Sequence, residues 1–162
     1  MKRKMWLAVL LLSLACIFTG CMSTREVKQY GLEDEDTIAL NLTRDPNVGT
    51  VFVTHVNGES TGAGFSSSGL FSGKKETYVN PVYIKLNGRP IVFTISCPVV
   101  VGYDDRLNEP IVRYRSTELR LTKLADIKAG DVLTLKWMYQ TQTFVFMDAT
   151  GNIVQQTIPT FN

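Results

Sequence analysis

The sequence predicts an all-β protein, an antiparallel β-sandwich or small barrel of about eight to ten short strands. Three observations support this. Apolar and polar residues alternate over many short segments, which is the period of a half-buried strand. Turn-forming pairs such as Asn57-Gly58 and Asn87-Gly88 separate the segments. No long segment after residue 20 has the 3.6-residue period of an amphipathic helix.

The first expected strands lie in residues 37–43 and 50–56, the second of which ends at Asn57-Gly58. Residues 82–86 and 91–95 flank a second Asn-Gly pair. Both residues of an Asn-Gly pair tolerate positive φ, so the pair between apolar runs favours a tight hairpin. We therefore expect residues 82–95 to form a hairpin.

The second half of the chain predicts further strands and one helical turn. Strands are expected at residues 99–103, 111–115 and 117–122, and a short helical turn at 123–129. Residues 133–140, 143–148 and 153–158 predict a three-stranded meander with Gly151 in its second turn. Its large aromatic residues recur on one face: Trp137, Tyr139, Phe144 and Phe146.

The N-terminus has the pattern of an export signal. Lys2, Arg3 and Lys4 precede an apolar run of about 14 residues, which is shorter than the roughly 20 residues of a permanent transmembrane helix. The run ends in Phe18-Thr19-Gly20-Cys21, which resembles the lipobox of bacterial lipoproteins, although Leu is more usual at the first position. An ordinary signal peptide or an uncleaved anchor are the alternatives.

The resemblance implies that Cys21 carries a diacylglycerol, that cleavage occurs before it, and that its new amino group is often acylated. Cys16 is a second candidate, but it would place Ser13 at the first lipobox position. Met22 stands where Asp would resemble an inner-membrane retention signal, which favours the periplasmic face of the outer membrane. The order of elements in the body is also similar to small β-sandwich domains of other envelope lipoproteins.

These features predict a signal peptide at 1–20, a lipidated N-terminus with an acidic tether at 21–36, and one β-sandwich domain at 37–162. Of the 17 basic residues, three leave with the signal, so the mature chain would carry 14 basic and 15 acidic residues. A near-neutral domain lacks the basic surface of a nucleic-acid binder. Cys97 would be its remaining free thiol, so no internal disulfide is expected.

Two groups of residues are candidate contact sites. The Gly/Ser-rich loop 57–75 contains Phe65, Leu70 and Phe71, which either pack over an edge of the sandwich or contact a partner or membrane. This loop lacks the helix and Gly-Lys-Ser/Thr ending of a phosphate-binding loop. Arg113 and Arg115 alternate along one strand, where they could bind phosphate or carboxylate groups or simply be solvated and paired with nearby acids.

We expect no catalytic residue and no metal site. Cys97 and His55 form the one conceivable Cys–His pair of the mature chain, and Cys97 lies in an apolar setting typical of inert core cysteines. One His and one thiol are too few for a zinc site. The acidic loop after Tyr103 is interpreted as a solvated turn.

The expected function is therefore a lipid-anchored envelope lipoprotein that acts as a non-catalytic interaction or assembly module facing the periplasm. Its expected partners are the membrane, through the lipid on Cys21, and an envelope protein; no other cofactor and no nucleic acid are expected. Two alternatives remain. One is a carrier of a small apolar ligand or lipid in an aromatic-lined cavity, and the other is a hydrolase that uses Asp and Glu.

Overall fold

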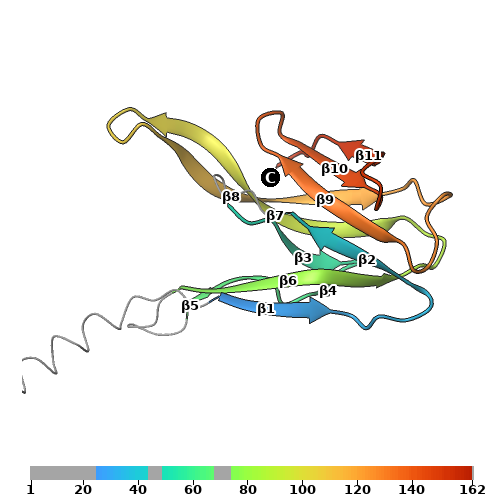
Figure 1. Ribbon diagram of the computed structural model, residues 1–162. Coiled ribbons are helices and arrows are strands. Elements are labelled where there is room, and N and C mark those ends of the chain that lie inside the picture. The colour runs from blue at the N-terminus through green and yellow to red at the C-terminus, as the bar shows by residue number, and fades with distance from the viewer. Residues whose placement is uncertain (1–24, 44–48, 68–73, 162) are drawn as a thin grey trace, which may run out of the picture.

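In the computed structural model, two β-sheets pack face to face (Figure 1). The structure describes residues 25–43, 49–67 and 74–161, and none of these is helical. The strands are β1 (Arg25–Tyr30), β2 (Thr37–Leu42), β3 (Phe52–Val56), β4 (Glu59–Ser60), β5 (Gly64–Ser67), β6 (Lys74–Lys85), β7 (Ile91–Asp104), β8 (Glu109–Leu121), β9 (Val132–Met138), β10 (Thr143–Met147) and β11 (Ile153–Thr157). The predicted all-β sandwich is confirmed.

The larger sheet has seven strands in the order β1-β6-β2-β9-β10-β11, with β5 also beside β6, and the smaller has the order β4-β3-β7-β8. Most pairs are antiparallel, but β1 with β6 and β2 with β9 are parallel. The sandwich is thus mainly antiparallel, as predicted, with two parallel pairs. The chain changes sheets between β2 and β3, between β4 and β5, between β6 and β7, and between β8 and β9, so strands distant in sequence become neighbours.

The two Asn-Gly pairs have different outcomes. Asn57 and Gly58 have φ of 51° and 86° and join the antiparallel strands β3 and β4, so that hairpin is confirmed. Asn87-Gly88 lies between β6 and β7, which belong to different sheets, so the second expected hairpin is wrong. An Asn-Gly pair specifies a chain reversal, not ladder pairing. Here the apolar faces of both strands are buried in the core between the sheets.

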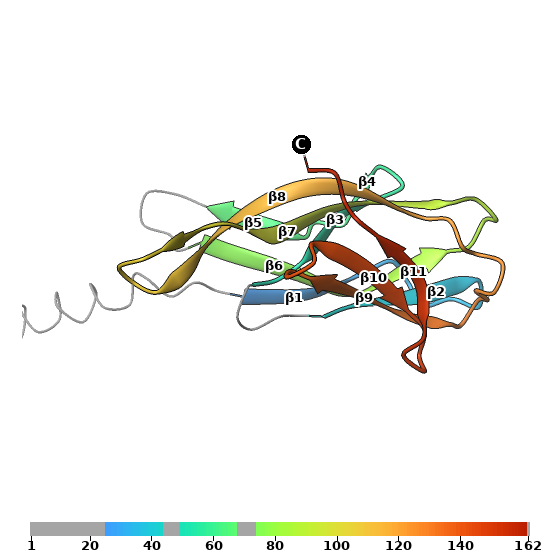
Figure 2. The same cartoon turned by 90° about the horizontal axis from the view of Figure 1, so that it is seen from above.

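The longest elements of the smaller sheet are β7 and β8, of 14 and 13 residues. Each joins two segments that the sequence predicted as separate strands. Their far halves leave the sandwich as a two-stranded ribbon (Figures 1 and 2). The ladder slips by one residue at Val101, between the pairs of Val100 and Gly102. Such a bulge bends and twists a ribbon locally.

The core fills the space between the sheets with aliphatic and aromatic side chains. Phe93 of β7 and Phe146 of β10 are fully buried and their ring centroids lie 5.8 Å apart across the two sheets. The indole N–H of Trp137 donates to the carbonyl of Pro98 at 2.9 Å, which also joins the sheets. The predicted meander is confirmed as β9, β10 and β11. Residues 123–129 form turns, so the expected helical turn is wrong.

The expected tether at 21–36 is wrong for its described part, because β1 occupies Arg25–Tyr30 and pairs with β6. The polar sequence of β1 has no apolar strand pattern, so this strand was not predicted. Four of its six residues are exposed, since it lies at the edge of its sheet, and the other two, Glu26 and Tyr30, are only half-buried. Lys75 of β6 pairs with Glu26 at 2.8 Å, and this contact lowers the pKa of the Glu26 carboxyl. Polar edge strands are a common way to prevent further strand pairing.

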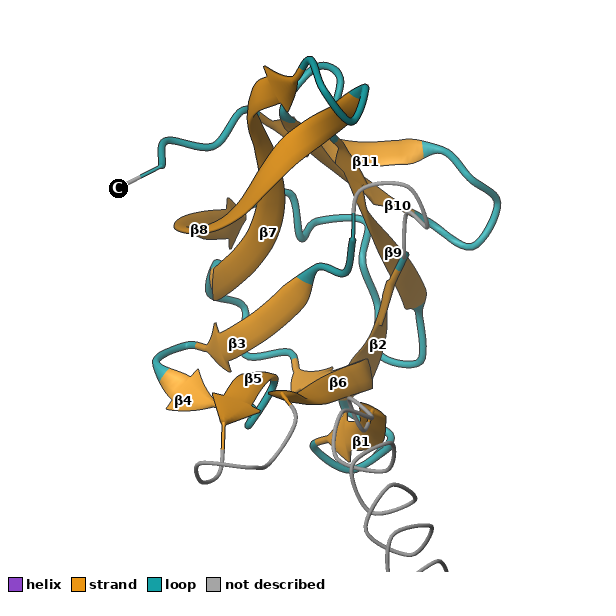
Figure 3. Ribbon diagram, turned by 90° about the vertical axis from the view of Figure 1, so that its left-hand side faces the viewer, coloured by secondary structure: helices purple, strands orange, loops and turns teal. Residues whose placement is uncertain are grey.

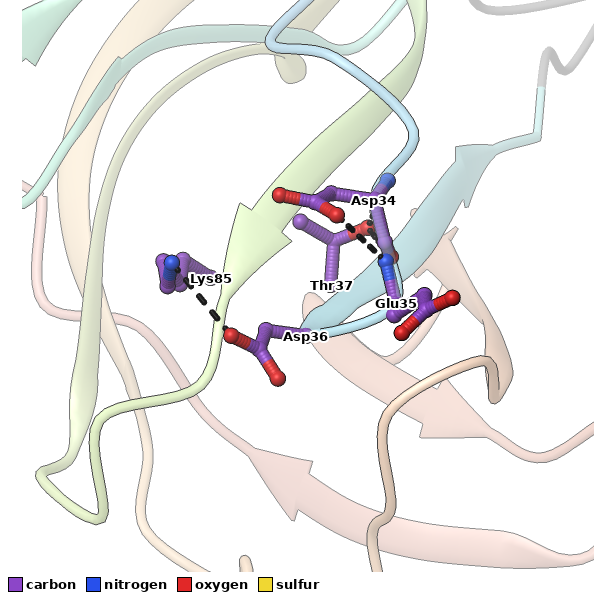
Figure 4. Close-up of polar contacts among 5 residues, drawn as sticks. All are labelled: Asp34, Glu35, Asp36, Thr37 and Lys85. Atoms are coloured by element: carbon purple, nitrogen blue, oxygen red, sulfur yellow. Dashed lines mark hydrogen bonds and ion pairs between the residues drawn. The ribbon is translucent and has the colours of Figure 1, made fainter.

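The acidic run is a fixed turn rather than a solvated linker (Figure 4). The hydroxyl of Thr37 donates to the carbonyl of Asp34 at 2.7 Å, and the Asp34 carboxylate accepts the N–H of Glu35 at 2.7 Å. Lys85, at the end of β6, pairs with Asp36 at 3.4 Å. Short polar side chains form such local turns readily. The turn therefore leads directly from β1 into β2.

Candidate interaction surface

Phe65 belongs to a three-ring cluster outside the main core. Val51, just before β3, and Val53 in β3 face the core, and Phe52 points to the opposite side, where Phe65 and Tyr114 cover it. The Phe65 ring lies 4.9 Å from each of the Phe52 and Tyr114 rings, in edge-to-face geometry. Half of the Phe65 side chain, 50%, stays exposed. Phe65 thus packs over the sandwich and still presents an apolar surface.

Three other predicted site residues lie outside the described residues. These are the lipidation candidate Cys21 and the loop residues Leu70 and Phe71. Their roles remain predictions.

Arg113 and Arg115 lie in β8, opposite Val99 and Cys97 of β7, and share one face of the ribbon as predicted. Both are exposed. Neither forms an ion pair or hydrogen bond with another described residue, and Glu118, one of the nearby acids, pairs with Arg120 at 2.9 Å instead. Two unneutralised guanidinium groups on one face can bind phosphate or carboxylate. Their binding role remains a prediction.

The β7–β8 ribbon exposes apolar residues that the sequence did not mark as a site. Leu107 in its turn is 68% exposed and Tyr103 is 54% exposed, and Val101 and Ile111 are each exposed by about two-fifths. The sequence carries one signal of this ribbon: the strand pattern from residue 91 to 104 is uninterrupted, and a strand of that length extends beyond the sandwich. Because this run was predicted as two short strands, the ribbon was not expected.

A second apolar surface is the outer face of the meander, defined here by Val132, Met138, Met147 and Ile153. In the ladder, Met138 is opposite Thr143 and Met147 is opposite both Thr134 and Ile153, so these side chains share a face. Ile153 is 62% exposed, and Val132 and Met138 are each 38% exposed. Exposed apolar residues gathered on one sheet face are typical of a protein contact surface.

The Cys97 thiol and the His55 imidazole are not arranged as a nucleophile and its base. Cys97 is fully buried, and burial raises the pKa of its thiol to about 12, so it stays protonated at neutral pH. The Nδ1 of His55 lies 3.1 Å from the hydroxyl of Thr54. Among the described residues, no group of three or more His, Cys, Asp or Glu side chains could hold a metal ion. Within the same ranges, no helix is long and apolar enough to cross a membrane.

Two surface depressions of the described part of the chain are open and partly polar. One of about 530 Å³ lies beside β9 and β11 and includes Asp126, Asp131 and Asp148 in its wall. These carboxylates cap turns where the structure gives them partners: Asp131 accepts the N–H of Lys128 at 2.7 Å, and Asp148 accepts the hydroxyl of Thr150 at 2.7 Å. Hydrogen bonds from Thr150 and Asn152 lower the pKa of Asp148. This environment favours structural carboxylates over a raised-pKa general acid.

The chain matches no family model, and neither the curated proteins nor the solved structures include one similar to it.

Proposed function

We propose that this chain is a lipid-anchored envelope lipoprotein, held by Cys21 at the periplasmic face of the outer membrane, that acts as a non-catalytic interaction module for another envelope protein. The outer face of the meander is the observation that carries the protein-binding part of this proposal. The resemblance of residues 18–21 to a lipobox supports the anchoring part. The near-neutral mature chain argues against a nucleic-acid partner.

Packing of the aromatic residues favours this function over a ligand carrier. Phe93, Phe144 and Phe146 are fully buried and Trp137 is nearly so. The Trp137 and Phe144 ring centroids lie 4.4 Å apart. These rings fill the space between the sheets, whereas a carrier would line a cavity of a few hundred Å³ with them.

Two experiments test the proposal. Cys21→Ser should abolish acyl labelling and leave the precursor uncleaved; continued labelling would contradict anchoring at Cys21. For the interaction, the native lipoprotein is captured from gently solubilised membranes and its co-purifying proteins are identified by mass spectrometry.

We expect Ile153→Glu to abolish co-purification of a specific envelope protein and Gln29→Glu to retain it. Gln29 is exposed in β1, at the opposite edge of the same sheet, so it controls for the added charge away from the meander face. Equal recovery with both variants would exclude the meander face as the contact surface.

A further inference from the structure

The structure limits how far the domain can stand from a membrane. Because β1 begins at Arg25, only three residues separate it from Cys21. An extended chain covers at most about 3.6 Å per residue, so the four steps from Cys21 to Arg25 span roughly 14 Å at most. If the lipid is on Cys21, as in the proposed function, the start of β1 must lie close to the bilayer surface.

The start of β1 lies at the same end of the molecule as the β7–β8 turn. Figures 1 and 2 place both at the left of the sandwich, from two directions. Figure 3 looks onto this end and shows the ribbon and β1 at opposite margins of it. At about 3.3 Å per residue, the 14 residues of β7 extend roughly 46 Å, so Arg89, just before β7, lies at the far end.

The chemistry of the ribbon fits the headgroup region of a bilayer. Leu107 and Tyr103 are its most exposed apolar side chains, and tyrosine is enriched at membrane–water interfaces. Asp105 and Glu109 flank the turn and are exposed, which restricts the turn to the polar headgroup layer rather than the hydrocarbon core.

The unneutralised arginines of the ribbon strengthen this fit. Arg113 and Arg115 follow the turn along β8 and share one face. Guanidinium groups bind phosphate oxygens with two parallel hydrogen bonds. At about 3.3 Å per residue, Arg113 and Arg115 lie roughly 13 and 20 Å along β8 from Glu109, so Arg113 is the nearer of the two to the lipid phosphates when the turn touches the bilayer.

We propose that the β7–β8 turn rests in the headgroup region of the same bilayer that holds the lipid on Cys21. This inference rests on the lipid anchor of the proposed function. The lipid and the ribbon then contact the membrane at two separated points, which fixes the orientation of the sandwich. The contact combines apolar side chains at the turn with lipid phosphate bound by Arg113.

The test uses the full lipidated protein reconstituted into vesicles of phosphatidylethanolamine and phosphatidylglycerol. Leu107→Cys and Arg89→Cys are each made in a Cys97→Ala background and labelled with an environment-sensitive fluorophore. Both sites are exposed, so labelling should not disturb the core. We expect the probe at 107 to shift to shorter wavelength, to lose quenching by aqueous iodide and to be quenched by nitroxide-labelled lipid. The probe at 89 should behave as in water.

Acyl labelling and vesicle flotation of the same samples separate the two proposals. A floating, acylated protein with aqueous emission from both probes would overturn the membrane contact and leave the anchor intact. A chain without acyl label that does not float would overturn the anchor and the contact together. Replacement of Arg113 by Gln should weaken the wavelength shift at 107; an unchanged shift would remove Arg113 from the contact.

Discussion

Gln155 joins the edges of the two sheets, and its replacement should destabilise the fold more than its position on a short edge strand suggests. Its side chain is 9% exposed. The amide Nε2 donates to the carbonyl of Arg120 at 2.6 Å, and Oε1 accepts the N–H of Thr122 at 2.9 Å. β11 and the end of β8 belong to different sheets, so this one amide completes backbone hydrogen bonding across the open side of the sandwich.

The cost of Gln155→Leu follows from these two bonds. A typical hydrogen bond contributes about 0.5–1.5 kcal/mol net, and a partner left unsatisfied in a buried setting adds to the loss. Leucine keeps the apolar contacts of the side chain but offers no donor or acceptor. We therefore expect a loss of about 2–3 kcal/mol in the free energy of unfolding.

The assay is urea unfolding followed by the fluorescence of Trp137. For a domain of this size, with a slope of roughly 2 kcal/mol per molar urea, the expected loss lowers the midpoint by about 1 M. Gln156→Leu is the matched control, because its neighbouring side chain is exposed, and it should stay within about 0.5 kcal/mol of the unchanged protein. If both variants unfold at the same urea concentration, the amide does not join the sheets as described.

Three further predictions concern other buried or constrained groups. The pKa of Cys97 is raised to about 12 from 9.0, so the unfolded chain ionises first and the free energy of unfolding falls as pH rises above 9, by about 1 kcal/mol at pH 10. Cys97→Ala should remove this fall in urea unfolding at pH 8 and 10, and an equal fall would contradict the burial. Because the pKa of Asp148 is lowered in the fold, its carboxylate stabilises the folded state at pH values above the ordinary pKa near 3.8, and this stabilisation is lost as pH falls below that value. Asp148→Asn should therefore lose less free energy of unfolding than the unchanged protein between pH 5 and 3, whereas identical acid transitions of the two proteins would argue against this role. Gly49 has φ of 131° and a Cβ there would lie 2.7 Å from the Tyr114 hydroxyl oxygen, so Gly49→Ala should lower the free energy of unfolding by about 1–3 kcal/mol. A Tyr114→Phe background should restore part of that stability, and no recovery would leave backbone strain as the whole cause.

The sequence predicted those elements whose apolar period coincides with their burial. In the meander, Leu133, Leu135 and Trp137 alternate with exposed residues, and the structure buries these three. The same reasoning failed for β1. An edge strand needs few buried residues, and its backbone hydrogen bonds impose no alternation of apolar and polar side chains. It also failed at Asn87-Gly88, since local turn chemistry does not determine which sheet receives the next strand.

The candidate surfaces were predicted less well than the fold for a related reason. The sequence marks Phe65 as an apolar residue in a polar segment, but its contacts with Phe52 and Tyr114 join three segments distant in sequence. Arg113 and Arg115 were placed on one face because alternation is a local property. Glu118 pairs with Arg120 and so leaves Arg113 and Arg115 unneutralised. Sequence spacing alone does not determine which of several nearby arginines an acidic side chain contacts.

The two exposed apolar surfaces can act at the same time. The β7–β8 ribbon belongs to the smaller sheet and the meander to the larger one, so membrane contact by one leaves the other uncovered. In the proposed function, a tether of only three residues between the lipid on Cys21 and β1 would restrict rotation of the domain, whereas a long linker would let any face meet the membrane. Restricted rotation lowers the orientational entropy that a partner must overcome when it binds. The proposed anchor would in this way support the proposed interaction, because it would present the meander face in a fixed orientation.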